Sequence, residues 1–179
     1  IGAYKNSVSG SSSEEGCVRV YDWNGISWNQ LGSDIVGENP HDESGLPVSL
    51  SSDGNIVAIG AYKNTGINGN AGHVRIYSFN GSSWNQLGQD IDGEAGGDQS
   101  GKSISLSGDG NIIAIGAPIN DGALNQGTTG HVRIYNYNGS SWNQLGVDID
   151  GEAGGDYFGT SVSLSSNGNT VAIGAPGND

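Results

Sequence analysis

The acidic segment DIDGEAGGD occurs twice, at residues 90–98 and 148–156. Each copy gathers carboxylates on a glycine-rich path, and Ca²⁺ takes about six to eight oxygen ligands of this kind. One interpretation is therefore a calcium site, with candidate ligands Asp90, Asp92, Glu94, Asp98, Asp148, Asp150, Glu152 and Asp156. The other, which we favour, is a pair of exposed loops whose acids cap turns, because the first repeat has Val36 where the others have an aspartate.

Arginine recurs between apolar neighbours at Arg19, Arg75 and Arg133. We expect each guanidinium to pair with a carboxylate of its own repeat or the adjacent one, since its planar donors match carboxylate geometry. Capture of an anionic ligand is the alternative. His73 and His131 stand two residues earlier, and they belong to separate repeats, so we do not predict a zinc site.

Catalytic patterns are missing from the sequence: it has no Gly-x-Ser-x-Gly elbow, phosphate-binding loop or zinc-binding histidine pair. We predict that the protein is not an enzyme; the alternative is an active site in further repeats outside this chain. The net charge of −13 argues against nucleic acid and anionic membranes as partners. No apolar run is long enough to insert in a bilayer.

The tripeptide Asn-Gly-Ser at Asn80 and Asn138 fits the N-glycosylation pattern. Both asparagines also stand in turn dipeptides, which is a sufficient structural reason for them. Glycans at these two positions are therefore a prediction that applies if the protein is secreted by a eukaryote. The single cysteine, Cys17, excludes a disulfide within the chain.

The hexapeptide SWNQLG occurs three times, at residues 27–32, 83–88 and 141–146, which indicates a repeat architecture. Each repeat has an Asn-Gly dipeptide and an Asp-Gly or Asn-Gly dipeptide between β-forming residues, which predicts two type I′ hairpins and hence four antiparallel strands. In the second repeat we expect strands at 73–79, 82–87, 102–106 and 111–115. SWNQLG would be the second strand of each unit.

Four-stranded sheets repeated at this interval are typical of β-propeller blades. We therefore predict an all-β fold of tandem four-stranded antiparallel blades, forming a partial β-propeller or an open stack. Recurring aromatic residues, including Trp28, Trp84 and Trp142, would pack neighbouring blades together. Residues 1–16 would end a preceding blade, 17–60, 61–118 and 119–176 would form three blades with connecting loops at 61–72 and 119–130, and 177–179 would begin the next connection.

The third repeat resembles the FG-GAP repeat, the blade unit of the integrin α-subunit propeller. Phe158 and Gly159 match the first half of the motif, and Gly174, Ala175 and Pro176 match the second half. This resemblance implies an extracellular or cell-surface adhesion, recognition or scaffold module without chemistry of its own. The calcium loop common in integrin-type repeats is shortened here, so we do not transfer it to Asp53 or Asp109.

Together these patterns predict a non-catalytic extracellular structural or adhesion module, assembling with other copies or further repeats into a surface filament. No cofactor would be required, and Ca²⁺ is the candidate ion. The alternative is a blade module of a larger surface protein that binds carbohydrate or a protein ligand. A carbohydrate module would need a solvent-facing tryptophan among Trp23, Trp28, Trp84 and Trp142.

Overall fold

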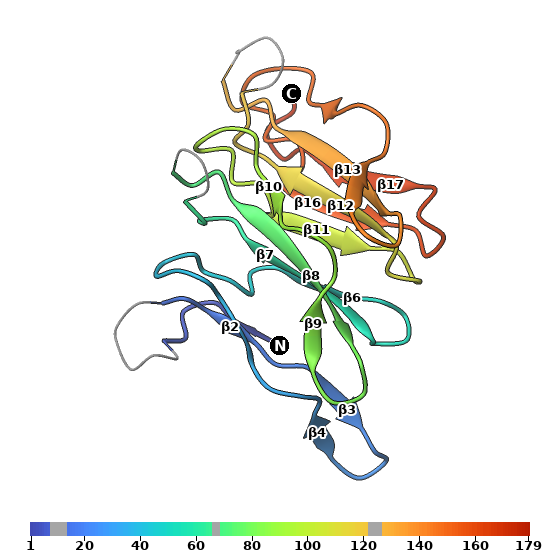
Figure 1. Ribbon diagram of the computed structural model, residues 1–179. Coiled ribbons are helices and arrows are strands. Elements are labelled where there is room, and N and C mark those ends of the chain that lie inside the picture. Colours follow the sequence, from blue (N-terminus) through green and yellow to red (C-terminus); the bar gives the residue numbers. More distant parts are fainter. Residues whose placement is uncertain (8–13, 66–68, 122–126) are drawn as a thin grey trace.

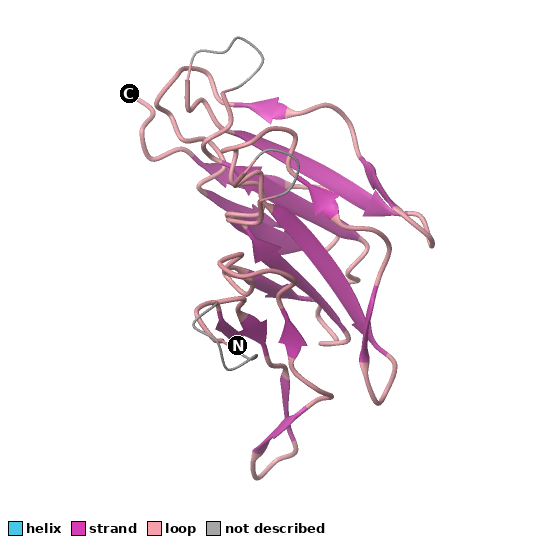
Figure 2. Ribbon diagram, turned by 60° about the vertical axis from the view of Figure 1, so that its left-hand side comes forward, coloured by secondary structure: helices cyan, strands magenta, loops and turns pink. Residues whose placement is uncertain are grey.

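The computed structural model describes residues 1–7, 14–65, 69–121 and 127–179. Every regular element in this part of the chain is a β-strand, as Figure 2 shows. The paired strands run antiparallel, which confirms the all-β prediction. None of the described segments forms a helix of the length and hydrophobicity that crossing a bilayer requires.

Two complete sheets occupy the middle of the chain, and each has three strands plus an outer strand in two halves. The second sheet contains β6 (Val48–Leu50), β7 (Ile56–Ala61), β8 (His73–Phe79), β9 (Trp84–Gln86) and β10 (Ile91–Asp92). The third contains β11 (Ser103–Leu106), β12 (Ile112–Ala117), β13 (His131–Tyr137), β14 (Trp142–Gln144) and β15 (Ile149–Asp150). The interruption of the outer strand follows from Gly88 and Gly146, which have positive φ angles.

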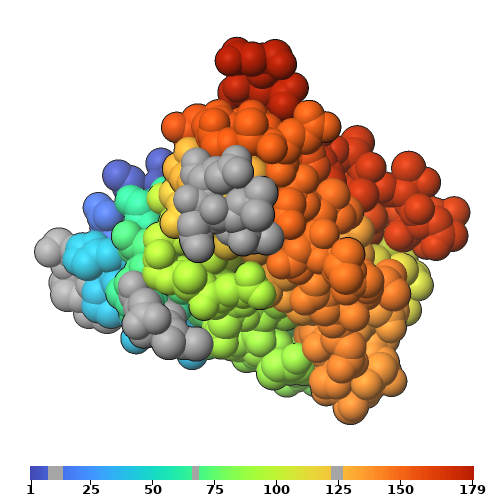
Figure 3. Space-filling view, turned by 90° about the horizontal axis from the view of Figure 1, so that it is seen from above, coloured from blue at the N-terminus to red at the C-terminus, as the bar shows by residue number. Residues whose placement is uncertain are grey.

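The sheets at the two ends of the chain have fewer strands. The first consists of β1 (Gly2–Ala3), β2 (Cys17–Val18) and β5 (Ile35–Val36), continued by the hairpin of β3 (Tyr21–Trp23) and β4 (Trp28–Gln30). The fourth is the hairpin of β16 (Ser161–Leu164) and β17 (Val171–Gly174). In Figure 1 the sheets follow one another from the N-terminal to the C-terminal end, and Figure 3 shows the same progression across the surface.

The core lies between the sheets. One cluster joins Val18 and Val20 of the first sheet to Val57 and Ile59 of the second. Another joins side chains of the second and third sheets, including Ala58, Ile76, Leu106, Ile113 and Trp142. Because alternate residues of a strand face opposite sides, β7 contributes to both clusters. The runs IVAIGA and IIAIGA are therefore nearly all apolar, as expected of strands covered on both faces.

The predicted blade boundaries cut across the sheets. The second sheet takes β6 and β7 from the predicted blade 17–60 and β8 to β10 from the predicted blade 61–118, and the third sheet is divided in the same way. SWNQLG supplies the outer edge strand of the first, second and third sheets. The sequence period sets the length of a unit but not where it begins, since a repeat read from any starting point is equally periodic. Residues 8–13, 66–68 and 122–126 of the predicted segments lie outside the described residues.

The predicted hairpins are all present, but the prediction of type I′ turns is wrong. In each turn only the glycine is left-handed, for example Gly25 at φ 95° and Gly54 at φ 72°. Asn24 instead starts its turn by accepting two backbone hydrogen bonds on its side-chain oxygen, from Ile26 and Ser27, both at 2.9 Å. This side-chain capping lets a longer loop close without a second residue at positive φ.

Candidate functional site

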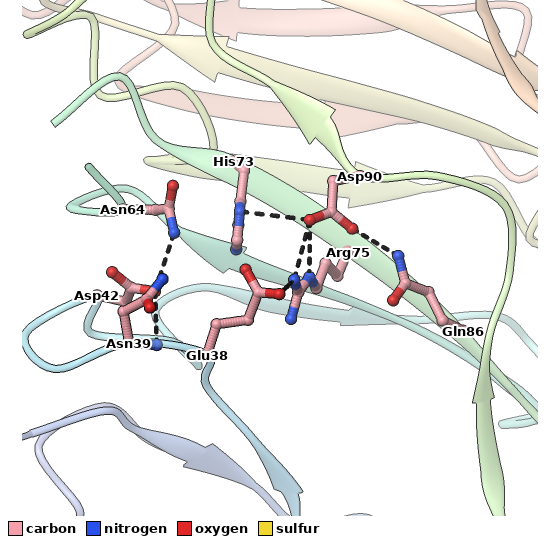
Figure 4. A network of polar contacts seen from close by, with 8 residues as sticks. All are labelled: Glu38, Asn39, Asp42, Asn64, His73, Arg75, Gln86 and Asp90. Atoms are coloured by element: carbon pink, nitrogen blue, oxygen red, sulfur yellow. Dashed lines mark hydrogen bonds and ion pairs between the residues drawn. The ribbon is translucent and has the colours of Figure 1, made fainter. Parts of the chain in front are cut away.

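An arginine on the central strand of the second sheet bridges two sheets (Figure 4). Arg75 donates to Asp90 of its own sheet from Nε at 3.1 Å and from Nη2 at 2.9 Å. Its Nη2 also contacts Glu38, which follows β5 of the first sheet. The Arg75 side chain is only 13 % exposed, so its charge is shielded from water and compensated by both carboxylates. Arg75 thus makes both of the pairings that the sequence analysis expects.

His73 lies beside this bridge, two residues earlier on β8 (Figure 4). Its Nδ1 is 3.9 Å from the Asp90 carboxylate, and its side chain is 5 % exposed. Burial lowers the pKa of His73, and the nearby positive charge of Arg75 lowers it further. The imidazole is therefore neutral at pH 7, and the guanidinium carries the positive charge of the network.

A buried carboxylate completes the network on the loop side. Asp42 is fully buried and accepts hydrogen bonds from the Asn39 backbone at 3.2 Å and the Asn64 side chain at 2.9 Å. Equivalent Asp–Asn pairs recur at 2.9 Å between Asp98 and Asn120 and at 3.2 Å between Asp156 and Asn178. Each pair ties the acidic loop of one sheet to the loop that follows the second strand of the next.

The arginine bridge is repeated at the following junction. Arg133 on β13 contacts Glu94 of the second sheet at 3.2 Å, and its side chain is 8 % exposed. His131 Nδ1 lies 3.7 Å from Asp148, and burial again lowers the pKa of this histidine. In the first sheet the corresponding arginine, Arg19, forms a two-pronged contact with Asp34 at 2.8–3.0 Å and is 45 % exposed.

Two of these networks have the composition of a metal centre. The ligand atoms of Glu38, His73 and Asp90 lie within 4.8 Å of one another, as do those of Glu94, His131 and Asp148. Neutral imidazole and carboxylate groups suit Zn²⁺ and similar ions. An arginine already contacts carboxylates of each cluster, however, and so provides positive charge. The arrangement therefore acts as an ion-pair clamp between sheets, in which the arginine offsets part of the negative charge of the carboxylates.

The eight predicted calcium ligands do not gather at one place. Asp90, Glu94 and Asp148 belong to the arginine–histidine networks, while Asp98 and Asp156 are buried in the Asp–Asn pairs. The remaining three, Asp92, Asp150 and Glu152, are exposed. Glu38 is a site residue that sequence reasoning missed, and His73 and His131 were noted only as isolated residues of separate repeats. The signal was available, because Glu38, Glu94 and Glu152 occupy equivalent positions, as do the two histidines.

Asp53 and Asp109, where we do not predict an integrin-type calcium loop, accept hydrogen bonds from residues of their own turns. Asp53 accepts hydrogen bonds from the Ser51 hydroxyl at 2.6 Å and from the backbone and side chain of Asn55, both at 3.0 Å. These donors lower the pKa of Asp53 to about 2. In the fourth sheet Asn167 accepts the equivalent hydrogen bonds from Ser165 and Asn169, so the turn does not depend on a charge.

The candidate glycosylation residues, Asn80 and Asn138, are exposed at the tips of hairpins. The side-chain oxygen of Asn80 accepts hydrogen bonds from the backbone of Ser82 at 3.0 Å and of Ser83 at 2.9 Å. Asn138 makes the same contacts with Ser140 and Ser141. Both residues therefore have the turn role that the sequence predicts, and their position leaves them accessible to modification.

In the second and third sheets the repeated tryptophan links the outer strand to the preceding sheet. Trp84 Nε1 donates to the Leu31 carbonyl at 2.8 Å, and Trp142 Nε1 donates to the Leu87 carbonyl at 2.7 Å. Trp142 is 3 % exposed, whereas Trp28 of the first sheet is 66 % exposed. The same residue in the same strand is thus buried only where a preceding sheet is present.

The glycines of the two motif halves lie where backbones of adjacent sheets approach. Gly159 has φ 87° and donates its N–H to the Gly174 carbonyl of its own sheet at 3.1 Å. A Cβ on Gly159 would lie 2.7 Å from the His131 carbonyl of the preceding sheet, closer than real contacts allow. Gly116, the equivalent of Gly174 in that sheet, also lies against Gly159. The motif therefore marks glycines that permit close stacking.

Comparison with known proteins agrees with this geometry. Residues 147–179 match the sequence model of the FG-GAP repeat. A search among curated proteins found no match to the chain. Among solved structures, the fold is similar to that of a Bacteroides uniformis protein assigned as a 6-phosphogluconolactonase, with a TM-score of 0.57 and 14 % identity over 90 % of this chain. This chain spans 41 % of that protein's length, and the likeness concerns the fold alone. The chain thus carries an FG-GAP repeat at residues 147–179, within an all-β stack of blade-like sheets of the kind that a partial propeller or an open blade stack contains.

Proposed function

We propose that the protein is a non-catalytic structural or adhesion module that acts outside the cell. The observation that supports this most is the repetition of the junction chemistry. Arginine, tryptophan and aspartate side chains make the same contacts between the first and second sheets as between the second and third. Side chains that could otherwise act on a substrate are therefore engaged in holding blades together, as in repeat proteins whose stability comes from neighbouring units.

The composition supports the same proposal. A net charge of −13 favours a soluble surface that repels its own kind unless specific contacts or cations intervene. FG-GAP repeats are blade units of surface proteins, which supports an extracellular location. Calcium binding at the exposed acids and glycans at Asn80 and Asn138 would add to such a module but are not required for it.

The non-catalytic part of the proposal is tested by assaying the purified protein with lactone and ester substrates, including 6-phosphogluconolactone. We expect hydrolysis at the rate of buffer alone. Turnover that scales with protein concentration and persists through repurification would refute it. Location is tested by treating intact source cells with protease and following the protein by immunoblot. Loss of the intact band supports surface exposure, and full protection contradicts it.

Carbohydrate binding is a second candidate, and the exposure of one aromatic pair favours it. Trp23 and Trp28 are 49 % and 66 % exposed, with ring centroids 5.5 Å apart. Stacking of sugar rings on these faces would change tryptophan fluorescence, which a titration with oligosaccharides measures. The pair Tyr137 and Trp142 occupies the same position in the third sheet and is closed off by the second sheet. A binding-driven fluorescence change that Trp23→Ala abolishes would favour this candidate over a purely structural module.

A further inference from the structure

The junction between the first and second sheets and the junction between the second and third carry the same three ligand groups. We infer that each of these junctions binds one divalent transition-metal ion, with Zn²⁺ the best match, through a histidine and two carboxylates. The first site consists of Glu38, His73 and Asp90, and the second consists of Glu94, His131 and Asp148. The inference goes beyond the proposed function and does not rest on it, because a zinc site between blades requires neither catalysis nor a particular location.

The three ligand groups of each site are within reach of one ion. The histidine nitrogen and the two carboxylate oxygens lie within 4.8 Å of one another. His73 Nδ1 is 3.9 Å from the Asp90 carboxylate, and His131 Nδ1 is 3.7 Å from that of Asp148. Both distances exceed the limit of about 3.2 Å for a nitrogen–oxygen hydrogen bond. They are only slightly longer than the roughly 3.4 Å between two ligands of a tetrahedral Zn²⁺ ion, whose bonds are about 2.0–2.1 Å long.

The two histidines lack the partners that buried polar groups normally have. Their side chains are 5 % and 3 % exposed, and the hydrogen bonds among the described residues include none to either imidazole. Buried polar groups are nearly always hydrogen-bonded, so each imidazole needs an explanation. In the tautomer that carries its proton on Nε2, the Nδ1 lone pair stands beside two carboxylates (Figure 4). That arrangement is favourable once a cation lies between them.

The charge of each network matches a divalent cation. Asp42 is fully buried, and its charge acts on His73 together with the charges of Glu38 and Asp90. With the histidine neutral, these three carboxylates and the guanidinium of Arg75 leave a formal charge of −2. The equivalent carboxylates around Arg133 leave the same charge; they are Glu94, Asp98 and Asp148. Because uncompensated charge is costly away from water, one divalent ion at each junction would stabilise the network.

The arginine and the ion can share the carboxylates. Asp90 accepts two hydrogen bonds from Arg75 and one from Gln86, and an ionised carboxylate has about four lone-pair sites. Arg75 contacts Glu38 at Oε1, which leaves Oε2 for an ion. Arg75 would then act as an outer partner that orients both carboxylates. The glutamate side chains are 45 % exposed at Glu38 and 51 % at Glu94, so an ion can enter from water.

The ligand set selects the ion and gives it a role. One imidazole nitrogen with two carboxylates suits Zn²⁺, whereas Ca²⁺ takes about six to eight oxygen ligands. The glutamate of each site follows the outer strand of one sheet, and the histidine and aspartate belong to the next sheet. A bound ion would therefore cross-link neighbouring sheets, and zinc should stabilise the folded stack because it binds only where the sheets meet.

Isothermal titration calorimetry of the chelator-treated protein with Zn²⁺ tests the inference. We expect two ions per chain, a higher Tm with zinc, and no displacement of zinc by a roughly tenfold excess of Ca²⁺. His73→Ala and His131→Ala should each remove one ion, and the double variant should bind none. Glu38→Gln should weaken binding at the first junction at least about tenfold. His41→Ala is the matched control, because His41 is exposed and belongs to neither site.

Nuclear magnetic resonance of the histidine nitrogens tests the same sites in the parent protein, so the result does not depend on whether a variant folds. Zinc should shift the Nδ1 resonances of His73 and His131 and leave those of His41 unchanged. Absence of zinc binding, binding that the double histidine variant retains in full, or saturation without a shift at either Nδ1 would overturn the inference. None of these results bears on turnover or surface location, so the proposed function would stand or fall by its own assays.

Discussion

The same substitution at two equivalent positions separates the effect of the neighbouring sheet from that of the residue itself. Trp142→Ala removes a side chain that is 3 % exposed and hydrogen-bonded at 2.7 Å to the preceding sheet. Trp28→Ala removes the equivalent side chain, which is 66 % exposed. Both residues stand in the sequence SWNQLG, so strand propensity and turn chemistry are the same in the two variants.

The expected magnitudes follow from burial. Removal of a buried tryptophan typically lowers the free energy of unfolding by about 3–5 kcal/mol, because it removes apolar contact and leaves a cavity. For a chain of this size that corresponds to a fall in Tm of roughly 6–20 °C. Trp28→Ala removes mostly exposed surface and should cost less than about 1 kcal/mol. Trp84→Ala should fall between the two, since Trp84 is partly buried.

Urea unfolding followed by circular dichroism measures the three variants against the parent, at a protein concentration low enough to keep the chain monomeric. The predicted order of destabilisation is Trp142, then Trp84, then Trp28. Equal losses at Trp142 and Trp28 would refute the reasoning, because they would mean that the tryptophan stabilises its own sheet rather than the contact with the preceding one.

Three further predictions concern other contacts between or within sheets. Gly159→Ala should lower the free energy of unfolding by at least about 1 kcal/mol more than Gly146→Ala in urea titrations, because both glycines have positive φ but only Gly159 lies against a neighbouring backbone. Glu94→Gln should cost about 1–3 kcal/mol by the same assay, because it leaves the buried Arg133 without its charge partner. Asp53→Asn should reduce the loss of Tm as pH falls from 3.8 to about 2, because the folded-state pKa of Asp53 is depressed and its contribution to stability disappears over that range.

Each of these predictions has an outcome that contradicts it. Equal destabilisation by the two glycine variants would mean that close backbone approach at Gly159 is unimportant. If Glu94→Gln lowers the free energy of unfolding no more than the exposed Asp92→Asn does, the ion pair between Arg133 and Glu94 does not stabilise the protein. If Asp53→Asn leaves the pH dependence of Tm unchanged, a group other than Asp53 accounts for the loss of stability in acid. The substitution itself should preserve the turn, since the amide of Asn167 accepts the equivalent hydrogen bonds in the fourth sheet.

Much of the fold is predictable from the sequence because its determinants are local and repeated. The six hairpins follow from turn dipeptides between β-forming residues, and the strand at 73–79 is predicted to the residue. Stacking follows from apolar runs such as IVAIGA, which are too hydrophobic for a strand with a solvated face. The FG-GAP motif at residues 147–179 is also readable directly.

The boundaries of the sheets and the contacts between them cannot be predicted from the sequence period. A repeat has no marked starting point, so the pairing of β7 with β8 across a loop could not be told from the pairing within one sequence unit. The side-chain networks combine Glu38 of one sheet with His73 and Arg75 of the next, residues more than 30 positions apart. Such proximity is a property of the stack. It becomes predictable only once the sheet boundaries are known.

The central claim is that each sheet is stabilised chiefly by the sheets on either side of it, and native-state amide hydrogen exchange tests this most directly. Strands β7, β8, β12 and β13 lie in sheets covered on both faces, so their amides should exchange slowest, near the rate set by global unfolding. The amides of β3, β4, β16 and β17 in the monomeric protein should exchange at least about tenfold faster. Uniform protection across all four sheets would contradict the claim.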